Sequence, residues 1–202
     1  KKPYVCVLAF PCAPWSPLGN LNKGPWTEAR RRRDKVLEEF AVECAVEQME
    51  NGRLFFIENP RTSFAWRVLA KLRKLQQDKR VYTWHFDQCM FDLTSAEGVL
   101  HKKATCVLSN SYEIYLALHE MKCDKSHLPH AHIIGGKKIS EPAGHYSKLL
   151  STTVVQAAEK EFSKQFPHND FFCLAAHAEN DEEVENDLCD SDSSEDEFVR
   201  KE

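Results

Sequence analysis

Four short apolar runs, separated by segments with helical periodicity, constrain the fold of this 202-residue chain more than any other feature. Each run has the length of a buried strand, and the segments between them carry apolar residues at helical spacing. An order of strand, helix, strand, helix, strand is typical of a parallel sheet with crossover helices. We therefore predict an α/β fold with a mostly parallel sheet, with strands at residues 4–9, 53–57, 80–86 and 106–109 and helices at about 27–50, 62–77, 111–121 and 145–165.

The first long helix is predicted to begin at Thr27, a suitable N-cap, and to end before Asn51 and Gly52, a suitable C-terminal cap. Four consecutive arginines, residues 30–33, lie in its first turns. They could meet a phosphate backbone or form a solvated helix face. The side expected to face the core is apolar and consists of Val36, Leu37, Phe40, Ala41, Cys44 and Ala45.

The first predicted strand leads directly into a stiff loop that contains a cysteine. Cys12 follows the carboxyl end of the strand, which is the edge where ligands bind in open α/β sheets. Two prolines restrict the loop, so we expect the thiol to be accessible to a ligand rather than packed in the core. This pattern predicts a nucleophile in the stretch Phe10-Pro11-Cys12-Ala13-Pro14-Trp15-Ser16-Pro17-Leu18-Gly19.

Two motifs follow the first two predicted strands, namely Pro11-Cys12-x-Pro14-Trp15-Ser16-x-x-Gly19 and Glu58-Asn59-Pro60. The first resembles the catalytic Pro-Cys loop of cytosine-C5 DNA methyltransferases, P-C-Q-P-F/W-S-x-x-G, and the second is similar to that family's Glu-Asn-Val motif. They occur in the family's order, with one helix between them. Ala13 replaces the usual Gln, and Pro60 replaces the usual Val. With a later Lys-Lys-x-Thr, the pair also resembles methyltransferase-like segments of phage genomes and retroelement polyproteins.

The resemblance implies a Rossmann-like methyltransferase sheet, of which this chain would hold the catalytic half as a partial domain. It implies that Cys12 is a nucleophile that adds to C6 of cytosine, and that Glu58 is an acid hydrogen-bonded to N3 of the ring. The base would be flipped out of a DNA duplex. The residues expected to contact the substrate are Ser16, Asn59, Arg61 and Lys103, the last standing where the family has the first arginine of a Gln-x-Arg-x-Arg motif.

The methyl donor implied by the resemblance is S-adenosylmethionine. The family binds it with a glycine-rich turn upstream of the Pro-Cys loop, and no Gly-x-Gly occurs in this chain. The chain begins at Lys1 and its first strand already leads into Cys12. We therefore expect a piece of a longer parent chain, whose upstream segment holds the donor.

Two other functions fit the same residues. The chain could be a non-catalytic nucleic-acid-binding or interaction segment, such as a degenerate methyltransferase-like module of a retroelement polyprotein. It could also be a hydrolase that pairs Cys12 with a histidine, although no rule selects the partner.

A second group of candidate residues lies in Cys123-x3-His127-x2-His130-x-His132. Thiolates and imidazoles are the ligands that zinc prefers, and a structural site needs four of them. The sequence predicts a possible zinc site made of Cys89, Cys123, His130 and His132. The alternative is a polar loop whose histidines are solvated.

Charge divides the chain into regions. Residues 1–178 hold 25 Lys and Arg against 19 Asp and Glu, whereas residues 179–202 hold 2 against 12. The mildly basic body suits a DNA partner, and the acidic end predicts a disordered, solvating tail, with a mimic of nucleic-acid charge or a kinase site as alternatives. We expect a methyltransferase-like part at 1–122, an irregular His/Cys region with a closing helix at 123–177, and the tail at 178–202.

The sequence also bears on the compartment. No apolar run approaches the ~20 residues that a membrane span requires. Eight scattered cysteines suit reduced intracellular thiols better than a disulfide framework. We therefore expect an intracellular protein, nuclear or cytoplasmic, without a membrane partner.

Overall fold

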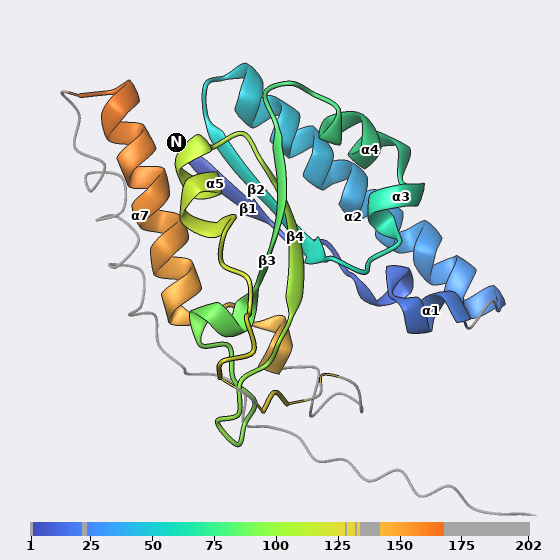
Figure 1. Cartoon of the computed structure of the whole chain (residues 1–202). Helices are drawn as coiled ribbons and strands as arrows, with labels where there is room; N and C mark the ends of the chain where they lie inside the picture. Colours follow the sequence, from blue (N-terminus) through green and yellow to red (C-terminus); the bar gives the residue numbers. More distant parts are fainter. Residues whose placement is uncertain (1, 22–23, 128, 132, 134–141, 168–202) are drawn as a thin grey trace, which may run out of the picture. The chain divides into compact units, whose positions relative to one another are not determined.

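A four-stranded mixed sheet with the order β1-β2-β4-β3 forms the centre of the fold (Figure 1). The computed structural model describes residues 2–21, 24–127, 129–131, 133 and 142–167. The acidic tail and the residues in the gaps lie outside this description. The strands are β1 (Val5–Leu8), β2 (Leu54–Pro60), β3 (Tyr82–Asp87) and β4 (Ala104–Ser109).

The predicted α/β class is confirmed, whereas the mostly parallel sheet is wrong. β1 pairs with β2 in parallel, but β4 pairs antiparallel with both β2 and β3. β1, β2 and β3 therefore run in one direction, and β4 is inserted between the last two in the opposite direction. The reason lies in the connection from β3 to β4, which holds the 3-10 turn η2 (Gln88–Phe91) and no crossover helix. Without a crossover, the chain returns antiparallel.

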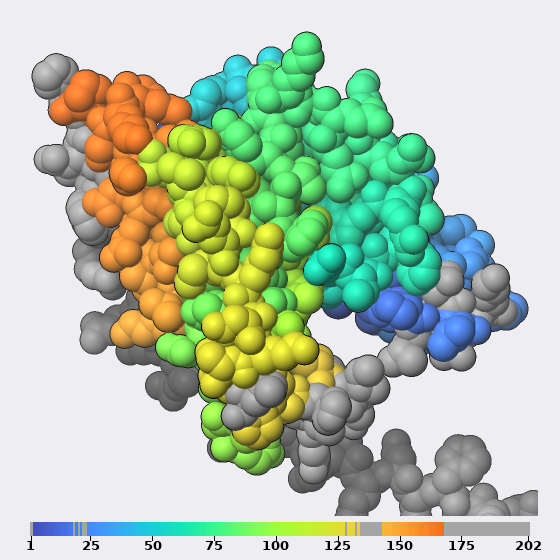
Figure 2. Space-filling view, viewed as in Figure 1, coloured from blue at the N-terminus to red at the C-terminus, as the bar shows by residue number. Residues whose placement is uncertain are grey.

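Two helical layers cover the two faces of the sheet (Figure 1). α2 (Pro25–Glu50), α3 (Ala65–Val68) and α4 (Ala70–Gln76) pack on one face. α5 (Tyr112–Leu118) and α7 (Lys148–Gln165) pack on the other, and Figure 2 shows α7 in orange beside α5 in yellow-green. The other short elements are α1 (Pro17–Leu21), η1 (Ala13–Trp15) and η3 (Pro142–Gly144).

β2 carries the core of both layers because its side chains alternate between the two faces. Phe55 and Ile57 join the cluster under α2, while Leu54 and Phe56 join the cluster under α5 and α7. All four are at most 2% exposed. The continuous apolar run in the sequence thus marks a strand buried on both sides, as predicted.

α2 turns a different side to the sheet than its sequence predicts. Val36, Leu37 and Phe40 are 65%, 47% and 60% exposed. Only Ala41 and Ala45 of the expected apolar side are buried, together with Asp34, Glu38, Val42, Gln48 and Met49. The prediction was wrong because polar residues on the inner side find hydrogen-bond partners there, Gln48 at the carbonyls of Pro3 and Leu54 and Glu38 at the N–H of Leu72.

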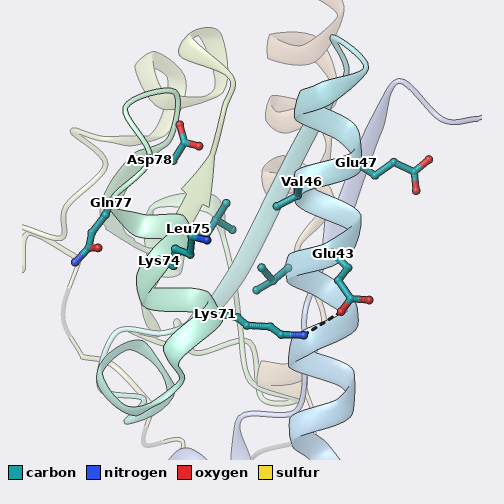
Figure 3. A pocket seen from close by; sticks show the side chains of 9 residues that line it. Glu43, Val46, Glu47, Lys71, Lys74, Leu75, Gln77 and Asp78 are labelled. Atoms are coloured by element: carbon teal, nitrogen blue, oxygen red, sulfur yellow. Dashed lines mark hydrogen bonds and ion pairs between the residues drawn. The ribbon is translucent and has the colours of Figure 1, made fainter.

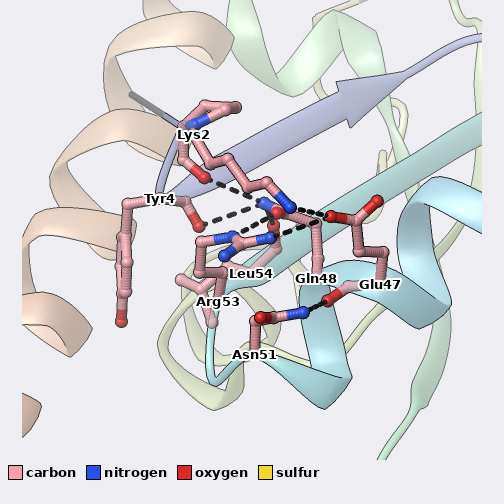
Figure 4. A network of polar contacts seen from close by, with 8 residues as sticks. Lys2, Tyr4, Glu47, Gln48, Asn51, Arg53 and Leu54 are labelled. Carbon is pink, nitrogen blue, oxygen red and sulfur yellow. Dashed lines mark hydrogen bonds and ion pairs between the residues drawn. The ribbon is translucent and has the colours of Figure 1, made fainter.

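Gln48 shows how a polar residue on the inner side of α2 supports the fold (Figure 4). Its side-chain amide donates to the carbonyl oxygens of Leu54 at 2.8 Å and Pro3 at 3.2 Å, and its oxygen accepts from the Arg53 guanidinium at 2.6 Å. The end of α2 is thereby joined to the beginnings of β1 and β2, which fixes the register of the parallel pair.

The single helix predicted at 62–77 is divided at Leu69, whose backbone is extended with φ −86° and ψ 112°. α4 therefore begins anew without a cap from its own N-cap side chain. Glu38 of α2 replaces that cap, since its carboxylate accepts the backbone N–H of Leu72. Glu161 of α7 acts in the same way on α5 by accepting the N–H of Glu113 at 3.2 Å.

Among the described residues, no helix is both long and apolar enough to cross a membrane.

Candidate functional site

The two motifs that follow β1 and β2 meet at one edge of the sheet. β1 and β2 are parallel neighbours, so their carboxyl ends lie side by side. The buried amide of Asn59 donates to the carbonyl oxygen of Phe10 at 3.0 Å. Phe10 directly precedes Pro11 and Cys12, so this bond holds the loop of residues 10–19, hereafter the Pro-Cys loop, against the end of β2.

Backbone hydrogen bonds shape the Pro-Cys loop. Cys12 is the N-cap of the short turn η1, and its carbonyl accepts the N–H of Trp15 at 3.0 Å. Trp15 is buried, and its carbonyl accepts the N–H of Phe64 at 2.7 Å. The Ser16 hydroxyl donates to Ala13 O at 2.9 Å and accepts from the N–H of Gly19 at 3.0 Å. Bonds to the loop's own backbone thus hold Cys12 in place.

Gly19 is required by the closeness of this turn. A Cβ built on Gly19 would lie 2.5 Å from the carbonyl oxygen of Ala13 and 3.1 Å from that of Pro14. Both contacts are with backbone atoms, which cannot rotate away. The glycine at the end of the Pro-Cys motif therefore has a steric reason.

Glu58 is buried at the same edge and has a cation and a hydroxyl beside it. The Lys103 ammonium lies 3.3 Å from Oε1, and the Tyr146 hydroxyl donates to Oε2 at 3.2 Å. Oε1 of Glu58 and Oδ1 of Asn59 are buried, and neither accepts a hydrogen bond from the described residues. Because Oε1 is already paired with the Lys103 ammonium, Oδ1 of Asn59 is the one of these two buried oxygens that lacks a partner among the described residues.

Charges at the edge act on the Cys12 thiol. Burial raises the pKa of Cys12 above its ordinary value, and the Glu58 carboxylate raises it further. The ammonium of Lys103 and the guanidinium of Arg30 lower it. Burial also raises the pKa of Tyr146, with help from the Glu58 carboxylate, so that this hydroxyl remains a donor. Cys12, Glu58 and Lys103 thus form one electrostatic unit.

The structure brings together four of the six residues expected to form the site, namely Cys12, Glu58, Asn59 and Lys103. The Ser16 hydroxyl is instead engaged within its own loop. Arg61 is exposed, and its charge acts on His85 and Cys106. Sequence reasoning missed Tyr146, because it lies in no motif and reaches Glu58 only through the position of α7.

A cavity of about 500 Å³ borders the Pro-Cys loop and is lined by Ala13, Pro14, Gly19, Gly24, Trp26, Thr27 and Arg30. Its volume lies within the range of small-ligand pockets. A larger cavity of about 800 Å³ lies between α2 and α4, where Figure 3 shows the Lys71 ammonium bonded to Glu43 at 3.0 Å. Neither cavity is lined by one of the expected site residues, so we assign no function to either of them.

A second constellation lies beyond the end of β3. The sulfur and nitrogen atoms of Cys89, Cys123, His127 and His130, hereafter the Cys/His cluster, all lie within 4.8 Å of one another. Cys123 Sγ is 3.3 Å from His127 Nε2 and 3.5 Å from His130 Nε2, and the two nitrogens are 3.1 Å apart. Three of the four predicted ligands are therefore together, with His127 beside them. His132 lies outside the described residues.

The Pro-Cys loop edge can present a thiol, a carboxyl group and an ammonium group to one ligand, and the Cys/His cluster can present four soft or borderline donors to a cation. In comparisons with known proteins, no protein-family model, no curated protein and no solved structure matches this chain.

Proposed function

We propose that the chain handles the base in a cytosine-C5 DNA methyltransferase reaction, with Cys12 as the nucleophile and Glu58 as the acid. The observation that carries the proposal is the meeting of two separate motifs at one sheet edge, where the Asn59 amide binds the backbone beside Cys12. Lys103 supports it, since the residue aligned with the family's arginine lies 3.3 Å from Glu58. The finer assignment to a Rossmann-like methyltransferase half is part of the proposal.

The chemistry begins with the low nucleophilicity of cytosine C5. The Cys12 thiolate forms a bond to C6, the C5=C6 double bond breaks, and its electron pair moves into the ring toward N3. In this step Glu58 acts in its protonated form, which donates a hydrogen bond to N3 and transfers its proton there, so that an enamine with a nucleophilic C5 results. Lys103 keeps a positive charge beside both groups and favours the thiolate of Cys12.

The methyl donor, S-adenosylmethionine, does not fit the residues of this chain. Its seven glycines never occur as Gly-x-Gly, so the glycine-rich turn that binds the methyl donor in the family has no counterpart in this sequence. We include in the proposal that an upstream segment of a longer parent chain supplies the donor site. No step that involves the donor is assigned to residues of this chain.

The addition of Cys12 to C6 can be tested without a methyl donor. The enamine can take a proton from water at C5, lose the original C5 hydrogen, and expel Cys12 to restore cytosine. The chain should therefore release tritium from a single-stranded oligonucleotide that carries [5-³H]cytosine, where no flipping cost arises. Cys12→Ala should reduce the release to the rate without protein, whereas Cys44→Ser, a change at a half-buried thiol of α2 outside the site, should not affect it.

Tritium release by wild type at the rate without protein would overturn the catalytic proposal. The alternative is a non-catalytic nucleic-acid-binding segment, and the raised pKa of Cys12 counts against catalysis because burial disfavours the thiolate that attacks. Fluorescence anisotropy with the same oligonucleotide distinguishes the cases. Binding without tritium release supports the alternative, and binding with release supports catalysis.

A further inference from the structure

We propose that Cys89, Cys123, His127 and His130 bind one zinc ion in a closed tetrahedral site that has a structural role. The ligand set differs from the one expected from the sequence by having His127 in place of His132. The inference does not depend on the proposed function of the Pro-Cys loop.

The interatomic distances carry the proposal. With Zn–N of about 2.0 Å and Zn–S of about 2.3 Å, the edges of a tetrahedron are about 3.3 Å between two nitrogens and about 3.5 Å between nitrogen and sulfur. The corresponding distances in the Cys/His cluster are 3.1 Å between the histidine nitrogens and 3.3 and 3.5 Å from Cys123 Sγ. Three of the four donor atoms are therefore already spaced as around a zinc ion, and Cys89 Sγ lies within 4.8 Å of each of them.

The local backbone supports a thiolate at Cys123. Its sulfur accepts the backbone N–H of Lys125 at 3.3 Å. Lys125 has φ +70°, a left-handed conformation that a residue with a Cβ adopts at a cost. The Cys123 N–H in turn donates to Asp87 Oδ2 at 2.9 Å. The turn is thus arranged to direct an N–H at sulfur, as a metal-bound thiolate requires.

Burial gives a second reason for a cation. Cys89 is only 2% exposed and lies against the Cys123 thiol. Zinc binds thiolates and imidazoles, and a divalent cation would compensate the charge of two thiolates, of which that of Cys89 is buried.

A zinc ion here would fix the segment that presents Lys103. Gln88, next to Cys89, donates its backbone N–H to the carbonyl of Lys103 at 3.0 Å, and the Lys102 ammonium lies 3.8 Å from Asp87. The site would join η2 after β3 to the chain that follows α5. This cross-link would add a fixed connection between η2 and the chain after α5, next to the bond from the Cys123 N–H to Asp87.

The first test is metal analysis of the chain purified from zinc-supplemented cells. About one zinc per chain is expected for wild type, and near zero for Cys123→Ser and for His127→Ala. Cys44→Ser and His119→Ala change the same residue types outside the cluster and should retain the metal. His132→Ala should also retain it. Loss of zinc in His132→Ala with retention in His127→Ala would overturn the ligand set.

A second test uses the metal-free wild-type chain, so its main result does not depend on whether a variant folds. Cobalt(II) is titrated into metal-free wild-type chain, which should give the intense d–d bands of a tetrahedral site and thiolate charge-transfer absorption, both lost on addition of zinc. Cys89→Ser should weaken the charge-transfer band. A six-coordinate spectrum, zinc near zero in wild type, or a Cys89–Cys123 disulfide found by peptide mass mapping would overturn the proposal.

Discussion

The Pro-Cys loop and the Cys/His cluster both place a cysteine in a buried setting, and their partners give these cysteines different chemistry. Burial is the first cause of the raised pKa of both Cys12 and Cys89. Cys12 faces a carboxylate and two cations, whereas Cys89 faces a second thiol and two imidazoles. A thiol beside charged groups suits attack on a polarised substrate, and a thiol beside imidazoles suits a metal.

The two regions also differ in what holds them. The Pro-Cys loop is fixed by prolines, by backbone hydrogen bonds and by Asn59. The Cys/His cluster lies in irregular chain that is joined mainly by the Cys123–Asp87 bond and by the bridge between His101 and Ala131. The first region can keep its shape unaided, while the second is organised by the ligand we propose.

The largest effect is expected from a reciprocal pair of cysteine variants. Cys12→Ser should abolish tritium release from the labelled oligonucleotide and leave about one zinc per chain. Cys123→Ser should lose the zinc and still allow Cys12 to be alkylated. Tritium release and metal content, measured on both proteins, check this separation. If one substitution removed both properties, the two regions would not be independent.

The next effect concerns the two buried carboxylates that are paired with lysines. Glu58→Gln should lower tritium release by about 10²- to 10⁴-fold, because the acid that protonates N3 is removed. Glu113 of α5 is a matched control, since it is buried and binds Lys160 at 2.6 Å. Glu113→Gln should lower stability without changing release per folded chain. Equal losses in the two variants would show that Glu58 is only structural.

A smaller effect is expected from crowding the Pro-Cys loop. Gly19→Ala should lower the free energy of unfolding by about 1–3 kcal/mol, because the new methyl group meets a backbone oxygen at 2.5 Å. Gly144→Ala is the control, since nothing lies within 4 Å of its Cβ position. Urea denaturation of both variants measures the difference. A Gly19→Ala variant as stable as the control would show that the loop yields easily.

The smallest effect is a shift in the pH dependence of Cys12 alkylation. Lys103 lowers the pKa of this thiol, so Lys103→Gln should move the rate curve to higher pH. Glu58 raises the same pKa, so Glu58→Gln should move the curve to lower pH. Iodoacetamide labelling followed by peptide mass mapping gives the rate at each pH. Shifts of the same sign in both variants would contradict the electrostatic unit.

Local pattern predicts much of this fold. The four strands and the long helices were placed from apolar runs and helical spacing, because burial on both faces requires a continuous apolar strand such as Leu54–Ile57. The direction of β4 could not be predicted, since Ala104–Ser109 has the same apolar character whichever way it pairs. The side of α2 that faces the sheet was predicted wrongly, because Gln48 is buried through hydrogen bonds to backbone rather than through apolar contact.

The candidate site shows the same limit. Cys12 and Glu58 could be expected at one edge, since each follows a parallel strand. The contact of Tyr146 with Glu58 could not, because it depends on how α7 packs against the far face. For the cluster, the spacing of the histidines gave the region. That His127 joins the cluster depends on the turn at Lys125, and no local sequence motif predicts the left-handed backbone of that residue.

The central position of β4 has a consequence for how the chain assembles. β3 has no other neighbour than β4 among the described strands, and it reaches β2 only through β4. During synthesis, β1, α2 and β2 can associate early, but β3 has no edge to join until residues 104–109 have emerged. β4, the last of the described strands, therefore completes the sheet, and its pairing with β2, far back along the chain, is a long-range contact of the kind that slows folding.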